Sequence, residues 1–259
     1  MKVTIIQTNL FWEDREKNIE HFNHLLSKIN EPTDLIVLPE MFTTGFSMHP
    51  EKIAEEHLGL TFNWLTTKTK EKKAVITGSL AIKHNHQFYN RLHWIEPNGN
   101  SSFYDKRHLF RMAKEDEKYT PGKEKIIKQI GDMTIMPLIC YDLRFPVWSR
   151  NFQNQKPIYD VLVYVANWPE IRSYQWKQLL IARAIENQCF VIGVNRIGID
   201  GNNVNHSGDS LIINPRGEII NNPKSNEESI ETITLNKNYL NDFRKIFPVG
   251  LDADEFKII

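Results

Sequence analysis

The hydrophobic residues of the chain gather in short runs that are rich in β-branched side chains. Several of these runs are continuous rather than alternating, which is typical of strands that are buried on both faces of a sheet. The pattern predicts strands at residues 3–9, 34–40, 74–82, 134–140, 160–166, 189–195, 210–215 and 228–235.

Between these runs, other segments repeat their hydrophobic residues with the period of a helix. The segment 14–30 places apolar residues on one face and charged residues on the other, as an amphipathic helix does. The segment 172–188 has the same pattern, and the segment 62–73 has a weaker one. The residues expected to be buried by the first two helices are Ile19, Phe22, Leu25, Leu26, Ile29, Trp176, Leu179, Leu180 and Ala184.

The order of the segments indicates the fold class. Strands and helices alternate early in the chain, and residues 204–220 then have the pattern of two strands joined by a Pro-Arg-Gly turn. We therefore expect an α/β fold with mixed parallel and antiparallel sheets and with helices packed outside them. No repeat, low-complexity tract or linker interrupts the chain, so residues 1–259 are expected to form one domain.

Composition and charge narrow the classes of partner. The 259 residues are 41% hydrophobic, and 32 basic residues balance 32 acidic ones, so there is no electrostatic reason to expect nucleic acid or an anionic membrane. Cys140 and Cys189 are the only cysteines, which excludes a disulfide framework and a cysteine-based zinc site. The chain contains no apolar run of about 18 residues and no signal-peptide pattern at its N-terminus, so we expect a cytoplasmic protein.

Polar residues with catalytic potential stand where predicted strands end. Glu40, Cys140 and Asn167 each follow an apolar run, and ligand and catalytic groups of α/β proteins gather beyond the carboxyl ends of strands. Lys106, in a stretch with aromatic residues and an aspartate, is a further candidate. Taken one at a time, Cys140 also fits simple packing, Glu40 a charge that ends a strand, and Lys106 a solvated loop residue.

A cysteine, a glutamate and a lysine together can carry out acyl transfer. A carboxylate such as Glu40 can accept the proton of the Cys140 thiol, which is only slightly ionised at neutral pH. Because a carboxylate also raises the pKa of a thiol, activation needs a cation, which Lys106 would supply. The same cation and the backbone N–H of Tyr141 could stabilise the oxyanion that forms when sulfur attacks an amide.

Three stretches resemble, in order and spacing, the signature segments of the nitrilase-like carbon–nitrogen hydrolases. They are "LPEMFTTGF" at 38–46, "YDKRHLF" at 104–110 and "LICYDLRFP" at 138–146. The similarity extends over the whole chain through "VANWP", "ARAIENQCFVIGVNRIG" and "HSGDSLIINPRGEI". With the ending "FRKIFPVGLDADEF", the chain resembles most the bacterial omega-amidase branch of that family.

The resemblance implies a role for each motif residue. Glu40 would be the general base, Lys106 would steady the tetrahedral intermediate, and Cys140 would form the thioester. The family often adds a second glutamate before a Pro-Gly turn, and the spacing favours Glu115 over Glu117. The implied fold is a four-layer α-β-β-α sandwich that pairs into a homodimer, and the implied mechanism needs no metal and no organic cofactor.

The resemblance also implies the substrate. Omega-amidases of this branch deamidate 2-oxo acid amides, chiefly 2-oxoglutaramate and 2-oxosuccinamate, so the site should hold a donor for a carboxylate. Arg144 is the arginine nearest to the nucleophile in sequence and suits a carboxylate. Arginine at this place also occurs in relatives with uncharged substrates, however, so a structural ion pair is the favoured alternative. Arg172 is a second candidate, with a surface position as its alternative. The aromatic residues expected as apolar walls are Phe46, Tyr141 and Trp168.

Other interpretations remain at this point. The chain could hydrolyse another carbon–nitrogen bond, in a nitrile, a carbamoyl group or a different amide, or it could be a silent dimeric binding module. Cys189 lies in an apolar run and is expected to be packing. A serine-hydrolase set of His206, Asp209 and Ser210 is rejected, because no G-x-S-x-G pattern surrounds the serine.

Overall fold

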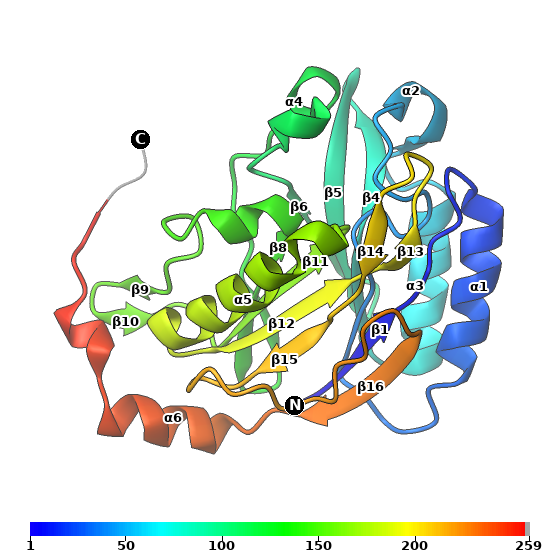
Figure 1. Cartoon of the computed structure of the whole chain (residues 1–259). Coiled ribbons are helices and arrows are strands. Elements are labelled where there is room, and N and C mark those ends of the chain that lie inside the picture. Colours follow the sequence, from blue (N-terminus) through cyan, green and yellow to red (C-terminus); the bar gives the residue numbers. More distant parts are fainter. Residues whose placement is uncertain (257–259) are drawn as a thin grey trace.

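Two mixed β-sheets lie face to face in the computed structural model, which describes residues 1–256 (Figure 1). The first sheet has the strand order β16-β1-β2-β4-β5-β6, and β3 pairs with β4. Strands β1, β2 and β4 are mutually parallel, whereas β16, β5 and β6 are antiparallel to their neighbours. The bounds are β1 Lys2–Gln7, β2 Leu35–Val37, β3 Glu55–Glu56, β4 Val75–His84, β5 Gln87–Ile95, β6 Ser101–Asp105 and β16 Ser229–Thr234.

The second sheet has the order β15-β12-β11-β8-β7. Its central strands β8, β11 and β12 are parallel, and β7 and β15 pair antiparallel at the edges. Every residue of β11 and β12 is buried, which explains why their sequences are continuously apolar. The bounds are β7 Lys128–Ile130, β8 Met133–Ile139, β11 Val161–Ala166, β12 Phe190–Asn195 and β15 Leu211–Ile213.

Helices cover the outer faces of the two sheets. Figure 1 shows α1 (Arg15–Ser27) and α3 (Leu60–Lys72) along one side of the molecule and α5 (Ser173–Asn187) on the opposite side. Alternate residues of β1 show the layering, because Val3 and Ile5 join the core between the sheets while Ile6 joins the core under α1 and α3. The expected four-layer α-β-β-α sandwich is therefore confirmed.

Smaller elements lie at the ends of this sandwich. They include two short hairpins, three further helices and four turns of 3₁₀-helix. Their bounds are β9 Phe152–Gln153, β10 Lys156–Pro157, β13 Ile197–Ile199, β14 Asn205–Ser207, α2 Pro50–Ile53, α4 Glu115–Lys118, α6 Lys237–Ile246, η1 Arg111–Ala113, η2 Cys140–Arg144, η3 Glu170–Arg172 and η4 Val249–Asp252. None of the helices within residues 1–256 has the length and apolarity needed to cross a membrane.

The elements expected from the sequence are present, with two differences. The hairpin expected over 204–220 does have its turn, with Gly217 at a φ of 87°, but its second strand shrinks to one bridge between Ile213 and Ile219. Its first part instead splits into β14, which pairs with β13, and β15, which joins the second sheet. Strands β5 and β6 were not expected, because polar residues such as Asn90 interrupt their apolar pattern.

Candidate active site

The candidate residues from both sheets meet at one end of the sandwich. Glu40 follows β2 and Lys106 directly follows β6, both in the first sheet, whereas Cys140 directly follows β8 in the second sheet. Glu115 is the first residue of the short helix α4. The strand ends thus bring together residues that lie far apart in the sequence, as expected for a site beyond the carboxyl ends of strands.

Lys106 joins two buried carboxylates. Its Nζ lies 2.9 Å from Glu40 Oε1 and 3.1 and 3.0 Å from the two carboxylate oxygens of Glu115. The exposed fraction is 1% for Lys106 and 0% for both glutamates. Burial by itself lowers the pKa of Lys106, but the carboxylates of Glu115 and Glu40 outweigh this effect and raise the pKa, so the ammonium stays charged.

The structure separates the two candidates for the second glutamate. Glu115 is buried against Lys106, and its Oε2 accepts a hydrogen bond of 2.6 Å from the backbone N–H of Phe110. Glu117, two residues later on α4, is exposed. Burial raises the pKa of Glu115, Lys106 lowers it and the Glu40 charge raises it again, with a net increase. The preference for Glu115 agrees with this geometry.

Cys140 occupies a strained position at the turn from β8 into η2. Its φ of 41° lies in the left-handed region, which costs a non-glycine residue about 1–3 kcal/mol. Such a turn directs the side chain out of the sheet into the adjoining cavity. The N–H of Tyr141, as the second residue of η2, has no acceptor within that 3₁₀-helix and can serve a ligand.

The electrostatics of Cys140 differ from the expectation that Lys106 dominates. Burial and the nearby Glu40 carboxylate raise the pKa of the thiol, and Lys106 lowers it by less. The resting cysteine is therefore a thiol, and attack requires its proton to move to a base.

A cavity of about 540 Å³ lies over the thiol. Lys106, Cys140, Tyr141 and Asn167 line its floor, and aromatic side chains line its walls. The expected wall residues Phe46 and Trp168 are both among the lining residues, and the Phe46 ring lies 4.8 Å from Lys106 Nζ. The other aromatic and apolar lining residues are Trp12, Met48, Phe110, Met112, Ala113, Pro169, Ile171 and Val204.

Two arginines line this cavity without a carboxylate partner. Arg144 lies 5.0 Å from the Trp168 ring centre and Arg172 lies 5.4 Å from the Phe110 ring centre. Among residues 1–256, neither side chain makes an ion pair or a hydrogen bond, so the alternative of a structural ion pair for Arg144 is wrong for the described chain. Burial lowers the pKa of Arg172, and the charge of Arg144 acts in the same direction.

The carboxylate of Glu40 is held by residues that the sequence indicated poorly. Asn167 donates its backbone N–H to Glu40 Oε2 at 2.7 Å and its side-chain Nδ2 to Glu40 O at 2.5 Å. Asn90 of β5 donates to Glu40 Oε1 at 2.8 Å and was missed entirely. The sequence indicated Asn167 only by its position at the end of a predicted strand. It did not indicate Asn90, because that residue lies in the middle of a strand that was not expected.

The residues of the rejected serine-hydrolase set, and Cys189, make structural rather than catalytic contacts. Ser210 Oγ contacts the backbone of Asn195, and Asp209 accepts hydrogen bonds from Ser173 and Ser207. His206 lines the cavity, but its Nδ1 faces backbone oxygens rather than a serine. Cys189 is fully buried among apolar residues, as expected for packing.

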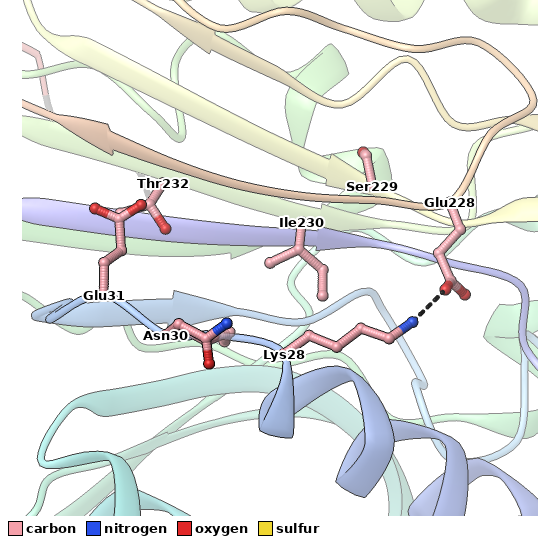
Figure 2. A pocket seen from close by; sticks show the side chains of 8 residues that line it. Lys28, Asn30, Glu31, Glu228, Ser229, Ile230 and Thr232 are labelled. Atoms are coloured by element: carbon pink, nitrogen blue, oxygen red, sulfur yellow. Dashed lines mark ion pairs between the residues drawn. The ribbon is translucent and has the colours of Figure 1, made fainter.

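A second hollow lies elsewhere on the molecule, between β16 and the segment after α1. It measures about 600 Å³ and is slightly larger than the cavity over Cys140. Figure 2 shows its lining side chains, with an ion pair of 3.9 Å between Lys28 and Glu228. No cysteine lines it, so we place the chemistry at the Cys140 cavity.

The comparisons with known proteins show the family of the chain. The model of the carbon–nitrogen hydrolase family matches residues 2–245. The chain is 45% identical to the omega-amidase YafV of Escherichia coli (strain K12), over 100% of this chain and 98% of that protein. It is 35% identical to the 2-oxoglutaramate amidase of Bacillus subtilis (strain 168), over 85% of this chain and 86% of that protein.

The fold is shared with a solved structure. XC1258 from Xanthomonas campestris, a carbon–nitrogen hydrolase superfamily protein with an arsenic adduct in its active site, superposes with a TM-score of 0.96 at 40% identity. The superposition covers 100% of this chain and 98% of that protein.

Proposed function

The chain belongs to the carbon–nitrogen hydrolase family, and from that premise we propose that it is an omega-amidase that hydrolyses the terminal amide of 2-oxo acid amides. The single observation that carries the substrate class is the pair of unpaired arginines, Arg144 and Arg172, in the cavity that holds Cys140. Two cations without a counter-ion among residues 1–256 favour a substrate with a carboxylate. The similarity to omega-amidases over the full chain supports the same assignment.

The proposed mechanism starts from the neutral thiol. Cys140 Sγ attacks the amide carbon while its proton passes to Glu40, and the oxyanion is stabilised by Lys106 and the Tyr141 N–H. The carbon–nitrogen bond then breaks, and the proton held by Glu40 leaves with ammonia. A water molecule that gives its proton to Glu40 attacks the thioester, which releases the 2-oxo dicarboxylate and restores the thiol.

Hydrolysis of a panel of compounds tests this assignment. We expect ammonia release from 2-oxoglutaramate and 2-oxosuccinamate, and an acyl thioester on Cys140 detected by mass spectrometry of the protein mixed rapidly with substrate. Turnover of a simple nitrile, or of a carbamoyl compound, without turnover of either 2-oxo acid amide would contradict the substrate. No hydrolysis of any panel member would favour a silent binding module.

Substitution of the cavity arginines is expected to weaken the recognition of the substrate carboxylate. In Arg144→Met we expect kcat/KM for 2-oxoglutaramate to fall about 10- to 100-fold, the range for a hydrogen bond to a charged group. Most of the change should appear in KM, because the carboxylate lies away from the reacting carbon. Steady-state kinetics of Arg144→Met and Arg172→Met measure the effect for each arginine.

Two controls separate carboxylate binding from general damage. Hydrolysis of butyramide, which has no carboxylate, should change little in Arg144→Met. Arg216 is an exposed arginine of the turn after β15, so Arg216→Met should leave both substrates unaffected. An equal loss for butyramide and 2-oxoglutaramate would contradict a role in carboxylate recognition.

We further propose that the single domain acts as a homodimer in a reducing cytoplasm. Large apolar side chains are exposed on and after α5 and α6, including Ile185, Ile246, Phe247 and Leu251, and a second copy of the chain would cover them. A reducing compartment also keeps a free thiol nucleophile from forming a disulfide. Light scattering of the purified protein measures the mass, and a monomer would contradict the dimer.

A further inference from the structure

Asn90 lies at the centre of the buried carboxylate cluster. Its Nδ2 lies 2.8 Å from Glu40 Oε1 and 3.3 Å from Glu115 Oε1, so one amide group bridges both glutamates. Its exposed fraction is 0%. Its backbone carbonyl also accepts the N–H of Lys106 at 3.0 Å, which ties the third member of the cluster to the same residue.

The orientation of the Asn90 amide is determined by its neighbours. The backbone N–H of Met41 donates to Ser79 Oγ at 2.9 Å, so the Ser79 hydroxyl proton is free for another acceptor. That acceptor is Asn90 Oδ1, at 2.8 Å from Ser79 Oγ. With Oδ1 occupied in this way, the two protons of Nδ2 must face the carboxylates of Glu40 and Glu115.

These donors have an electrostatic consequence. Two buried carboxylates share the single ammonium of Lys106, and an unpaired buried charge is costly. The Asn90 amide adds one donor to each carboxylate without adding charge. Within the described part of the chain, the other titratable groups beside the cluster are Cys140 and Tyr119, and neither supplies a cation.

We propose that Asn90 is a positioning residue for hydrolysis, which holds Glu40 and Glu115 ionised on opposite sides of Lys106 through the Ser79–Asn90 hydrogen-bond chain. Glu40 is thereby kept as a base for the nearby Cys140 thiol. The inference rests on the proposed roles of Glu40, Lys106 and Cys140. Without the Asn90 amide, the two carboxylates would compete for protons, and the base would be lost at low pH.

The substitution Asn90→Asp tests this role through the pH dependence of kcat. It replaces the donor with a third carboxylate of nearly the same shape, so like charges raise the pKa values of the cluster. The cluster then binds an extra proton, which must leave before Glu40 can act. We expect the acidic limb of the kcat–pH profile to move to higher pH by about one unit or more, with recovery of activity as the pH rises.

A second variant covers the case in which Asn90→Asp does not fold. Asn90→Ala removes the donors without adding charge, and kcat should fall about 10- to 100-fold while KM changes much less. Asn151 is an equally buried asparagine whose side chain contacts backbone groups and Asn187 only. Asn151→Asp is the matched control, and it should leave the acidic limb at its wild-type position.

The outcomes are decisive for Asn90. A wild-type acidic limb in Asn90→Asp, or a kcat within twofold of wild type in Asn90→Ala, would overturn the inference. If the wild-type protein hydrolyses no 2-oxo acid amide, the proposed function fails by itself. The rate of Cys140 alkylation by acrylamide then measures the same proton transfer, and it should be slower in Asn90→Asp than in wild type and in Asn151→Asp.

Discussion

Amide hydrolysis is expected to disappear in Cys140→Ala, with a loss of at least about 10⁴-fold in kcat, as is typical when a covalent nucleophile is removed. Glu40, Lys106 and the arginines remain in place, but no thioester can form. The fold should persist, because Cys140 lines a cavity and alanine removes only one sulfur atom from the edge of the core. Ammonia release and thermal unfolding, measured on the same preparation, check both parts of the prediction.

Cys189→Ala is the matched control for the nucleophile. Cys189 is fully buried and its sulfur is 3.9 Å from the backbone oxygen of Arg183, outside the catalytic cavity. The substitution removes packing, so it should lower the free energy of unfolding by about 1 kcal/mol and leave kcat unchanged. Activity near wild type in Cys140→Ala would contradict the mechanism, and loss of activity in Cys189→Ala would show that the assay reports damage to the fold.

The sequence allowed the reacting residues to be predicted because they occur together in three ordered segments, although each residue taken alone also fits a packing or surface role. Glu40 and Cys140 follow continuous apolar strands, and Lys106 lies in the motif between them. The strands themselves were predictable because burial on both faces leaves a run without polar interruptions. The direction of the pKa shift of Cys140 could not be predicted from the sequence. The burial that raises the thiol pKa depends on packing between segments far apart in the chain.

Asn90 shows why the rest of the site was not predictable. Its strand, β5, carries Asn90, Arg91 and His93 at positions that are buried in the structure, so it lacks the apolar pattern of a central strand. Asn90 and Arg91 are tolerated because partners from other elements satisfy them, as Asp105 does for Arg91 at 2.7 Å. The unpaired state of Arg144 and Arg172 likewise depends on which carboxylates the fold brings near, and spacing along the chain carries no information on it.

Lys106→Met is expected to remove activity and to destabilise the fold together. It takes away the only ammonium within residues 1–256 that contacts Glu40 and Glu115, and breaking a buried ion pair by removing one partner costs about 3–5 kcal/mol. It also removes the cation proposed to stabilise the oxyanion, for which we expect a loss of about 10²- to 10³-fold in kcat. Denaturant unfolding and steady-state kinetics measure the two effects.

The double variant Lys106→Met with Glu115→Gln separates stability from catalysis. Removing one carboxylate together with the ammonium leaves only Glu40 charged, so much of the lost stability should return while kcat stays low. The single variant should be most destabilised at neutral and higher pH, because the uncompensated Glu115 carboxylate has a raised pKa, and stability is lost as the pH rises above its ordinary value of 4.5. If the double variant recovered activity along with stability, Lys106 would serve only to neutralise Glu115, and its role at the oxyanion would be wrong.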